Sequence, residues 1–72
     1  GLVRREGQVT DELEACLTFR DEDELLYALT GELGSLGAGD QVTIEGVYLE
    51  TSSCIEGSTI EVVRAISGRE RP

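Results

Sequence analysis

Apolar and polar side chains alternate along five short stretches of the chain. A period of two is typical of β-strands that turn one face to a core and the other to solvent. Between two of these stretches the run 21–24 consists only of charged residues, which suits a hairpin tip. The pattern predicts five strands, at Leu2–Thr10, Cys16–Arg20, Leu25–Thr30, Gln41–Leu49 and Ser58–Ile66.

The stretch Gln41–Leu49 shows the clearest alternation. Val42 and Ile44 alternate with the polar residues Thr43 and Glu45. Beyond Gly46, the apolar side chain of Val47 falls on the opposite parity. A glycine at such a switch lets a strand bend sharply. We therefore expect Gly46 to bend this strand so that the sheet closes into a small barrel.

Four glycines lie among the ten residues from Gly31 to Asp40. They argue against a stable helix, since each costs about 1 kcal/mol relative to alanine. Leu33 and Leu36 are three residues apart and fit one apolar turn. The segment predicts a short helical or 3₁₀ turn that plugs one end of the barrel, followed by a turn at Gly39-Asp40.

Five strands in 72 residues fit a single domain. A sandwich generally needs about seven strands, whereas five strands with one turn between the third and fourth fit the OB topology. We predict an all-β fold, a small five-stranded OB-like antiparallel barrel over residues 1–72 with a short helical turn between strands 3 and 4. Residues 67–72 are expected to form a frayed tail. No apolar run approaches the roughly 18 residues of a membrane span.

The chain is strongly acidic, with six bases, fifteen acids and a formal net charge of −9. Between Glu6 and Glu61 there are fourteen acids and a single base, Arg20. This region should repel phosphate backbones and anionic membrane surfaces. Such a charge keeps a small protein soluble and favours a monomer, and it also attracts cations or a basic partner.

The two cysteines, Cys16 and Cys54, do not have CxxC spacing, and no histidine is present to complete a zinc site. Both stand beside predicted loops, at Asp11–Ala15 and Glu50–Ser58, which can meet at one end of a barrel. One disulfide or two unrelated buried thiols fit these residues. A disulfide would stabilise the fold by about 3–4 kcal/mol through loop closure, and it would indicate an oxidising compartment.

Tyr27–Gly31 and Leu36–Gly46 are similar to the pattern Y-x-L-x-G … L-x-x-G-D-x-V-x-V-x-G, and Cys16-Leu17 and Ser53–Val62 extend the match. Together these segments resemble a group of short, often exported bacterial OB-like domains of unknown function. The resemblance implies a Cys16–Cys54 disulfide and a periplasmic or secreted location, and it supplies no activity. The chain departs from the pattern at Leu17, where proline is expected, and at Glu24, where a turn glycine is usual.

Catalytic chemistry finds little support in the sequence. Without histidine or lysine, acid–base catalysis would fall to carboxylates, tyrosine or cysteine, and a cysteine nucleophile would lack its usual basic partner. No G-x-S-x-G, phosphate-loop or dinucleotide fingerprint is present. We therefore expect a protein that is not an enzyme and needs no cofactor.

The run Asp21–Glu24 is the one candidate for binding a hard cation such as calcium. Leu25 follows these acids, and the glycine that an EF-hand loop needs after its alternating acids is missing. A solvated hairpin tip is the favoured interpretation, because such loops sit at the surface, and no metal site is assigned.

Nucleic-acid binding, a common role of OB barrels, needs a basic groove and stacking aromatics. The chain has three aromatic residues, and Phe19 and Tyr27 stand at core parities. Arg4 or Arg5 could form a small basic spot with Arg64 if the terminal strands adjoin. Ion pairing of these arginines with Glu6, Glu45 or Glu61 is the favoured interpretation. The charge balance makes nucleic acid an unfavoured partner.

The leading hypothesis is a non-catalytic binding module that acts outside the cytoplasm on a protein, a peptide or an envelope component. The candidate partner surface consists of the acids in the two cysteine-bearing loops, Glu12, Glu14, Glu50 and Glu56. The alternatives are an OB-type single-stranded nucleic-acid binder and a structural subunit or appended domain that acts by assembly.

Overall fold

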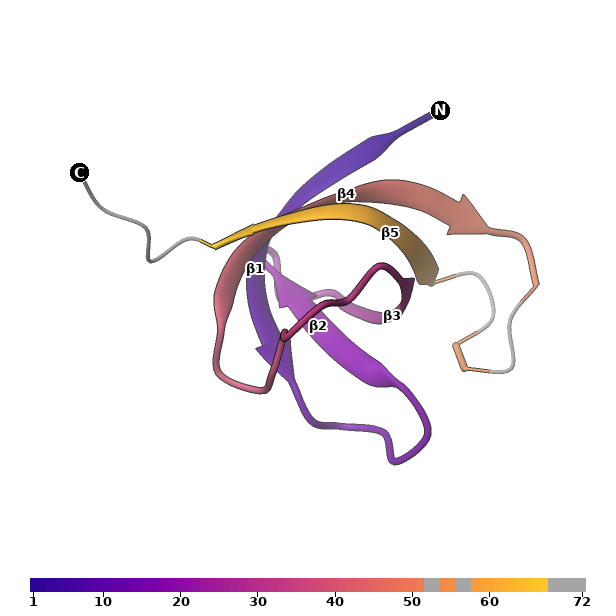
Figure 1. The fold of residues 1–72 in the computed structure, drawn as a ribbon. Coiled ribbons are helices and arrows are strands. Elements are labelled where there is room, and N and C mark those ends of the chain that lie inside the picture. Colours follow the sequence, from indigo (N-terminus) through magenta and orange to yellow (C-terminus); the bar gives the residue numbers. More distant parts are fainter. Residues whose placement is uncertain (52–53, 56–57, 68–72) are drawn as a thin grey trace.

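Five strands form the folded part of the chain in a computed structural model, which describes residues 1–51, 54–55 and 58–67. In Figure 1 they are β1 Val3–Thr10, β2 Leu17–Asp21, β3 Leu26–Gly31, β4 Gln41–Leu49 and β5 Thr59–Ser67. The predicted bounds of β4 are confirmed, and those of the other strands shift by one residue at one or both ends. The all-β prediction is thus confirmed for this part of the chain.

The strands close into a barrel in the order β1-β2-β3-β5-β4, with β4 pairing back onto β1 (Figure 1). Four pairs are antiparallel, and the pair of β3 and β5 is parallel. The prediction of an antiparallel barrel therefore holds for four of the five strand pairs and is wrong for β3 with β5. Strand directions can alternate around a closed ring only when the number of strands is even, so a ring of five contains a parallel pair.

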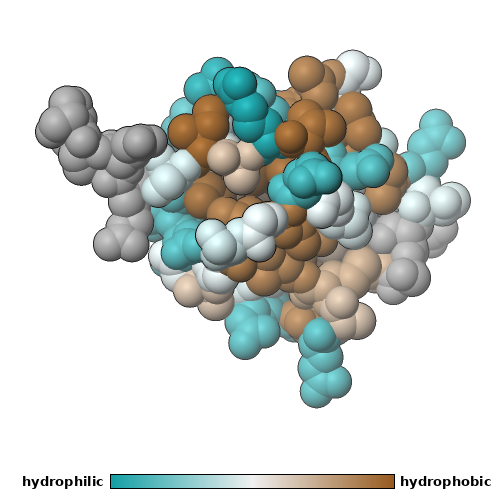
Figure 2. All heavy atoms as spheres, in the orientation of Figure 1, coloured by the Kyte–Doolittle hydropathy of each residue, from teal (hydrophilic) through white to brown (hydrophobic). Residues whose placement is uncertain are grey.

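The core fills the inside of the barrel with alternate side chains from all five strands. Its buried members are Val9, Phe19, Tyr27, Leu29, Val42, Ile44, Ile60 and Val62. The predicted burial of Phe19 and Tyr27 is confirmed. On the face seen in Figure 2, hydrophobic and hydrophilic side chains are interspersed, as is normal for the surface of a small protein. The alternation along the strands thus places the apolar face of the sheet inward.

Gly46 marks the predicted bend in β4. The register between β4 and β5 shifts between Glu45 and Gly46. A Cβ atom at position 46 would overlap the carbonyl oxygen of Glu61. Glycine therefore permits the close approach of β4 and β5 where the sheet curls around.

The segment between β3 and β4 contains no helical turn, contrary to the prediction. A 3.1 Å hydrogen bond from the Leu36 amide to the Leu33 carbonyl closes one turn, and an equally long bond closes a second turn at residues 37–40. Gly34 and Gly39 have φ angles of 58° and 98°, and this left-handed conformation interrupts a right-handed helix. Leu33 and Leu36 nevertheless pack against the core.

The last strand extends one residue further than predicted, because Ser67 belongs to β5. The rest of the predicted tail, residues 68–72, lies outside the described residues. In the described part of the chain, no helix has the length and apolar character needed to cross a membrane.

Candidate functional site

Cys16 and Cys54 form a disulfide, with their Cα atoms 6.2 Å apart. Cys16 directly precedes β2, and Cys54 lies between β4 and β5. The bridge therefore fastens the loop 11–16 to the loop 50–58, of which residues 50–51, 54–55 and 58 are described. We call these two segments the bridged loops. Of the two alternatives that the sequence left open, the structure has the disulfide.

A row of small residues crosses the outside of the barrel next to the bridged loops. Thr18 of β2 pairs with Ala28 of β3, which in turn pairs with Thr59 of β5. Each alternates with a core residue along its strand, so its side chain points away from the core. All three are nevertheless 0% exposed. Chain outside the barrel must therefore cover this row.

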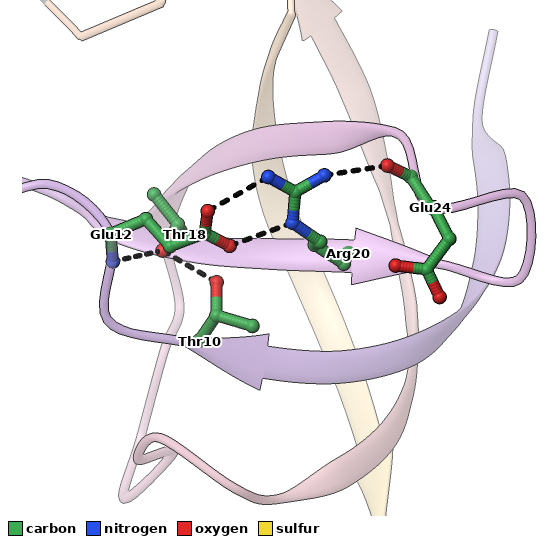
Figure 3. Close-up of polar contacts among 5 residues, drawn as sticks. All are labelled: Thr10, Glu12, Thr18, Arg20 and Glu24. Atoms are coloured by element: carbon green, nitrogen blue, oxygen red, sulfur yellow. Dashed lines mark hydrogen bonds and ion pairs between the residues drawn. The ribbon is translucent and has the colours of Figure 1, made fainter.

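The loop 11–16 reaches the row through Glu12. Its amide donates to Thr18 Oγ1 at 3.0 Å, and Thr10 Oγ1 lies 2.7 Å from the same oxygen (Figure 3). The Glu12 carboxylate accepts two hydrogen bonds from Arg20, 2.9 Å from Nε and 2.8 Å from Nη2. A third bond joins Arg20 Nη1 to the Glu24 carbonyl at 2.7 Å. Arg20 thus ties the loop 11–16 to the turn after β2.

The loop 50–58 meets the other end of the row. The Ala28 amide donates to the Ser58 carbonyl at 2.9 Å. The Thr59 hydroxyl donates to the Ile55 carbonyl at 2.7 Å. Both bridged loops are therefore fastened to the same outer strip of the barrel, and the disulfide links them to each other.

The four acids of the predicted partner surface differ in their exposure and in their ion-pair partners. The contact with Arg20 lowers the pKa of Glu12 and, in return, raises that of Arg20. Glu12 is therefore engaged within the domain. Glu14 and Glu50 are exposed, and neither has an ion-pair partner among the residues that the structure describes. Glu56 lies outside the described residues.

Asp21 lies at the far end of β2 and is not part of a solvated tip, contrary to the expectation for the run 21–24. Only 8% of the residue is exposed. Its Oδ1 accepts the amides of Asp23 and Leu25 at 2.8 and 3.0 Å, and its Oδ2 accepts the Tyr27 hydroxyl at 3.2 Å. Burial acts to raise the pKa of Asp21, but these bonds and the charge of Arg5 together hold it below its usual value.

Arg5 extends from β1 toward the same end of the barrel. Its guanidinium donates to the Tyr48 hydroxyl at 2.9 Å and to the Arg4 carbonyl at 2.8 Å. It also lies over the Tyr48 ring, 5.9 Å from the centroid, at a distance that permits a cation–π contact. Interaction with the Tyr27 and Tyr48 hydroxyls raises the pKa of Arg5. Arg5 is therefore a fixed positive charge in a largely acidic chain.

A pocket of about 440 Å³ separates β1 from the turn between β2 and β3. Arg5, Asp21 and Tyr27 are among the residues that line it. Its volume falls within the range typical of small-ligand sites, roughly 300–1,000 Å³.

The arginines on the outer face of β1 and β5 pair with Glu45 of β4. Arg4 Nη1 lies 3.8 Å from Glu45 Oε2, and Arg64 Nε lies 3.4 Å from Oε1. The prediction of ion pairing at Glu45 is confirmed for these two residues. Exposed pairs of this kind contribute little to stability, and the shared carboxylate reduces the positive charge of the spot.

Similarity to known proteins does not assign a function to these sites. Comparisons with protein-family models, curated proteins and solved structures found no match. Within the described residues, no group of three or more acids or cysteines is arranged to hold a metal ion. The function must therefore be argued from the geometry of the chain itself.

Sequence reasoning overlooked the pocket around Arg5 and Asp21. The signal was present, because Arg5 stands at the same parity as the inward-facing Val3, Gly7 and Val9. A charge at an inward position near a strand end indicates a polar group held at the mouth of a barrel.

Proposed function

We propose that this domain is a non-catalytic binding module that acts outside the cytoplasm, in the periplasm or as a secreted protein. Its contact surface is the exposed side of the bridged loops, and its partner is a protein, peptide or envelope component with positively charged groups. The observation that carries the proposal is the disulfide, which fixes two acidic loops beside each other. A surface ordered in advance loses less conformational entropy on binding.

Charge supports this choice of partner. Glu14 and Glu50 are exposed, and the net charge of −9 gives the molecule a negative field. Such a field raises the encounter rate with cationic partners and lowers it with nucleic acids and anionic membranes. The disulfide, in turn, fits an oxidising compartment.

We further propose that the barrel is OB-like and that the chain is related to the small bacterial domains with paired cysteines that its sequence resembles. A five-stranded barrel in the order β1-β2-β3-β5-β4 supports this assignment. OB domains commonly bind ligands on the face of strands 2 and 3 and at the loops that follow strands 1 and 4. The bridged loops occupy the corresponding positions here.

The same comparison favours a protein partner over single-stranded nucleic acid. Thr18 and Ala28, on the outer face of strands 2 and 3, are fully buried and offer no aromatic ring on which a base could stack. Arg20 on that face is engaged by Glu12. Fluorescence anisotropy with single-stranded DNA at low salt tests this alternative directly, and tight, salt-sensitive binding would favour it.

Charge reversal tests the proposed surface. The double variant Glu14→Lys/Glu50→Lys is compared with Glu22→Lys/Glu32→Lys, which makes the same change of net charge at exposed residues away from the bridged loops. The probe is a short, terminally capped oligo-arginine peptide, and binding is followed by amide NMR shifts. We expect the wild type and the control to show saturable shifts around Glu14 and Glu50, and the first variant to lose them. Equal binding by both variants would refute this surface.

A further inference from the structure

We propose that the pocket between β1 and the β2–β3 turn binds a small zwitterion, a molecule of the amino-acid class with one carboxylate and one ammonium group. The argument rests on two opposite charges, Arg5 and Asp21, that line the same pocket of about 440 Å³. The site lies at the opposite end of β2 from the bridged loops. The proposal is therefore independent of the proposed partner surface.

Asp21 forms a preorganised negative wall of this pocket. Two main-chain amides and the Tyr27 hydroxyl hold its carboxylate in place. A carboxylate offers about four acceptor positions, so these three bonds leave one for a ligand. A fixed, largely buried acceptor of this kind is suited to an ammonium group, because a charge-assisted bond gains strength where water is scarce.

Arg5 forms the positive wall. Bonds to the Tyr48 hydroxyl and the Arg4 carbonyl orient its guanidinium and use two of its five N–H donors. The remaining donors suit a carboxylate, which arginine recognises with a planar fork. Arg5 is only partly buried, so a ligand that enters from solvent can reach it.

Arg5 and Asp21 face one pocket without direct contact between their charged groups. No ion pair within 4.0 Å joins Arg5 and Asp21 in the described part of the chain. Two main-chain amides and Tyr27 hold Asp21, whereas the Tyr48 hydroxyl and the Arg4 carbonyl orient Arg5. A ligand that carries both charges would pair with Arg5 and Asp21 at once, whereas a ligand with a single charge would pair with only one of them.

The surroundings indicate the shape of the ligand. Glu22 and Asp23 also line the pocket on the side of the turn and strengthen its preference for an ammonium group there. Leu25, also in the lining, is 54% exposed and provides an apolar contact at the rim. An amino acid with an aliphatic side chain combines all three features.

Leucine and two single-charge analogues test the proposal by NMR titration of the wild-type protein. Leucine amide keeps the ammonium group without a carboxylate, and 4-methylpentanoate keeps the carboxylate without the ammonium group. We expect leucine to shift the amides of Asp23 and Leu25 saturably and to bind about tenfold more tightly than either analogue, as expected for loss of a hydrogen bond to a charged group. Equal binding of leucine amide would show a simple cation site and overturn the proposal.

Two arginine variants separate the pocket from a general charge effect. Arg5→Gln should weaken leucine binding about tenfold by removing the carboxylate anchor. Arg64→Gln removes the same charge from a residue that pairs with Glu45 and does not line the pocket, so its affinity should equal that of the wild type. Equal losses in both variants, or no shift of the Asp23 and Leu25 amides at millimolar leucine, would refute the site.

Discussion

Asp21 belongs to a run of four acids but differs from its neighbours in environment. Glu22, Asp23 and Glu24 are exposed, whereas Asp21 is buried and accepts three hydrogen bonds. The difference follows from parity, since Asp21 lies two residues beyond the inward-facing Phe19 on β2. Its carboxylate thereby replaces the next apolar residue of the core and fixes the turn into β3.

Replacing Asp21 by asparagine should make the domain less stable in a pH-dependent way. The folded protein holds the pKa of Asp21 below its ordinary value of 3.8. Its stabilising contribution is therefore complete above the unfolded pKa and is lost as the pH falls through the lower folded value. Urea unfolding at pH 7 should show a loss of about 2 kcal/mol for Asp21→Asn, and this difference should shrink below about pH 4. A difference that is constant with pH, or an equal loss for the exposed-site control Glu22→Gln, would contradict the prediction.

The absence of a side chain at Gly46 allows β4 and β5 to approach each other closely. Alanine at this position would place its Cβ on the Glu61 carbonyl, so β4 and β5 would have to separate. We expect Gly46→Ala to cost about 2 kcal/mol or more in urea unfolding, as overpacking commonly does. Gly37→Ala is the matched control, because no described atom lies within 4 Å of a Cβ atom placed there. Similar losses in the two variants would show that the close approach is not the cause.

At the scale of elements, the turn between β2 and β3 contains one residue with a strained backbone, at the position where the sequence departs from the expected glycine. Glu24 stands where the pattern that the sequence resembles usually has a turn glycine. It adopts φ = 66°, a conformation costly for residues with a Cβ atom. Glu24→Gly should therefore stabilise the domain by up to about 1 kcal/mol, because the bond of Arg20 to the residue 24 carbonyl does not need the side chain. Thermal unfolding measures the effect. Glu24→Gln removes the charge and keeps the strain, so an equal gain in that variant would assign the effect to charge.

The strands were predictable because the alternation of apolar and polar residues is a local pattern. The backbone of the segment between β3 and β4 was not predictable in this way. Alternation around Val42 and Ile44 fixes which face of β4 is buried, and this needs no knowledge of distant residues. The spacing of Leu33 and Leu36 fits a helical turn and a pair of tight turns equally well. The φ angle of Gly34 decides between them, and glycine permits both signs of φ. The core contact of the two leucines was thus predictable, and the backbone that produces it was not.

At the scale of the whole molecule, ring closure imposes a constraint that no single strand contains. A closed barrel with an odd number of strands must contain at least one parallel pair, and in this chain that pair is β3 with β5. The candidate site was harder to predict from the sequence. The loops that carry Cys16 and Cys54 were identified from the sequence, but the capture of Glu12 by Arg20 depends on the register of β1 and β2.

The disulfide is the clearest case in which a single link affects the whole fold. The bridged residues are 38 positions apart, and loop closure over that length stabilises the folded state by about 3–4 kcal/mol. Cys16→Ala/Cys54→Ala should lose about this amount in urea unfolding. Mass spectrometry of the wild type should show the two-hydrogen gain on reduction that a bridge requires. No difference in stability between the oxidised wild type and the double variant would remove the bridge from the account of the fold.

Removal of the bridge should also have a local signature, because main-chain amides join both bridged loops to the barrel close to the disulfide. The Ala28 amide depends on the Ser58 carbonyl, and the Glu12 amide depends on Thr18 Oγ1. Their hydrogen exchange should accelerate more in the double variant than that of the Val9 amide, which is bonded to the Asp40 carbonyl away from the bridge. Equal acceleration at all three amides would mean that the bridge acts only through global stability. A selective change at Ala28 and Glu12 would instead show that the disulfide keeps the outer strip of β2 and β3 covered, on which the choice of a protein partner over nucleic acid depends.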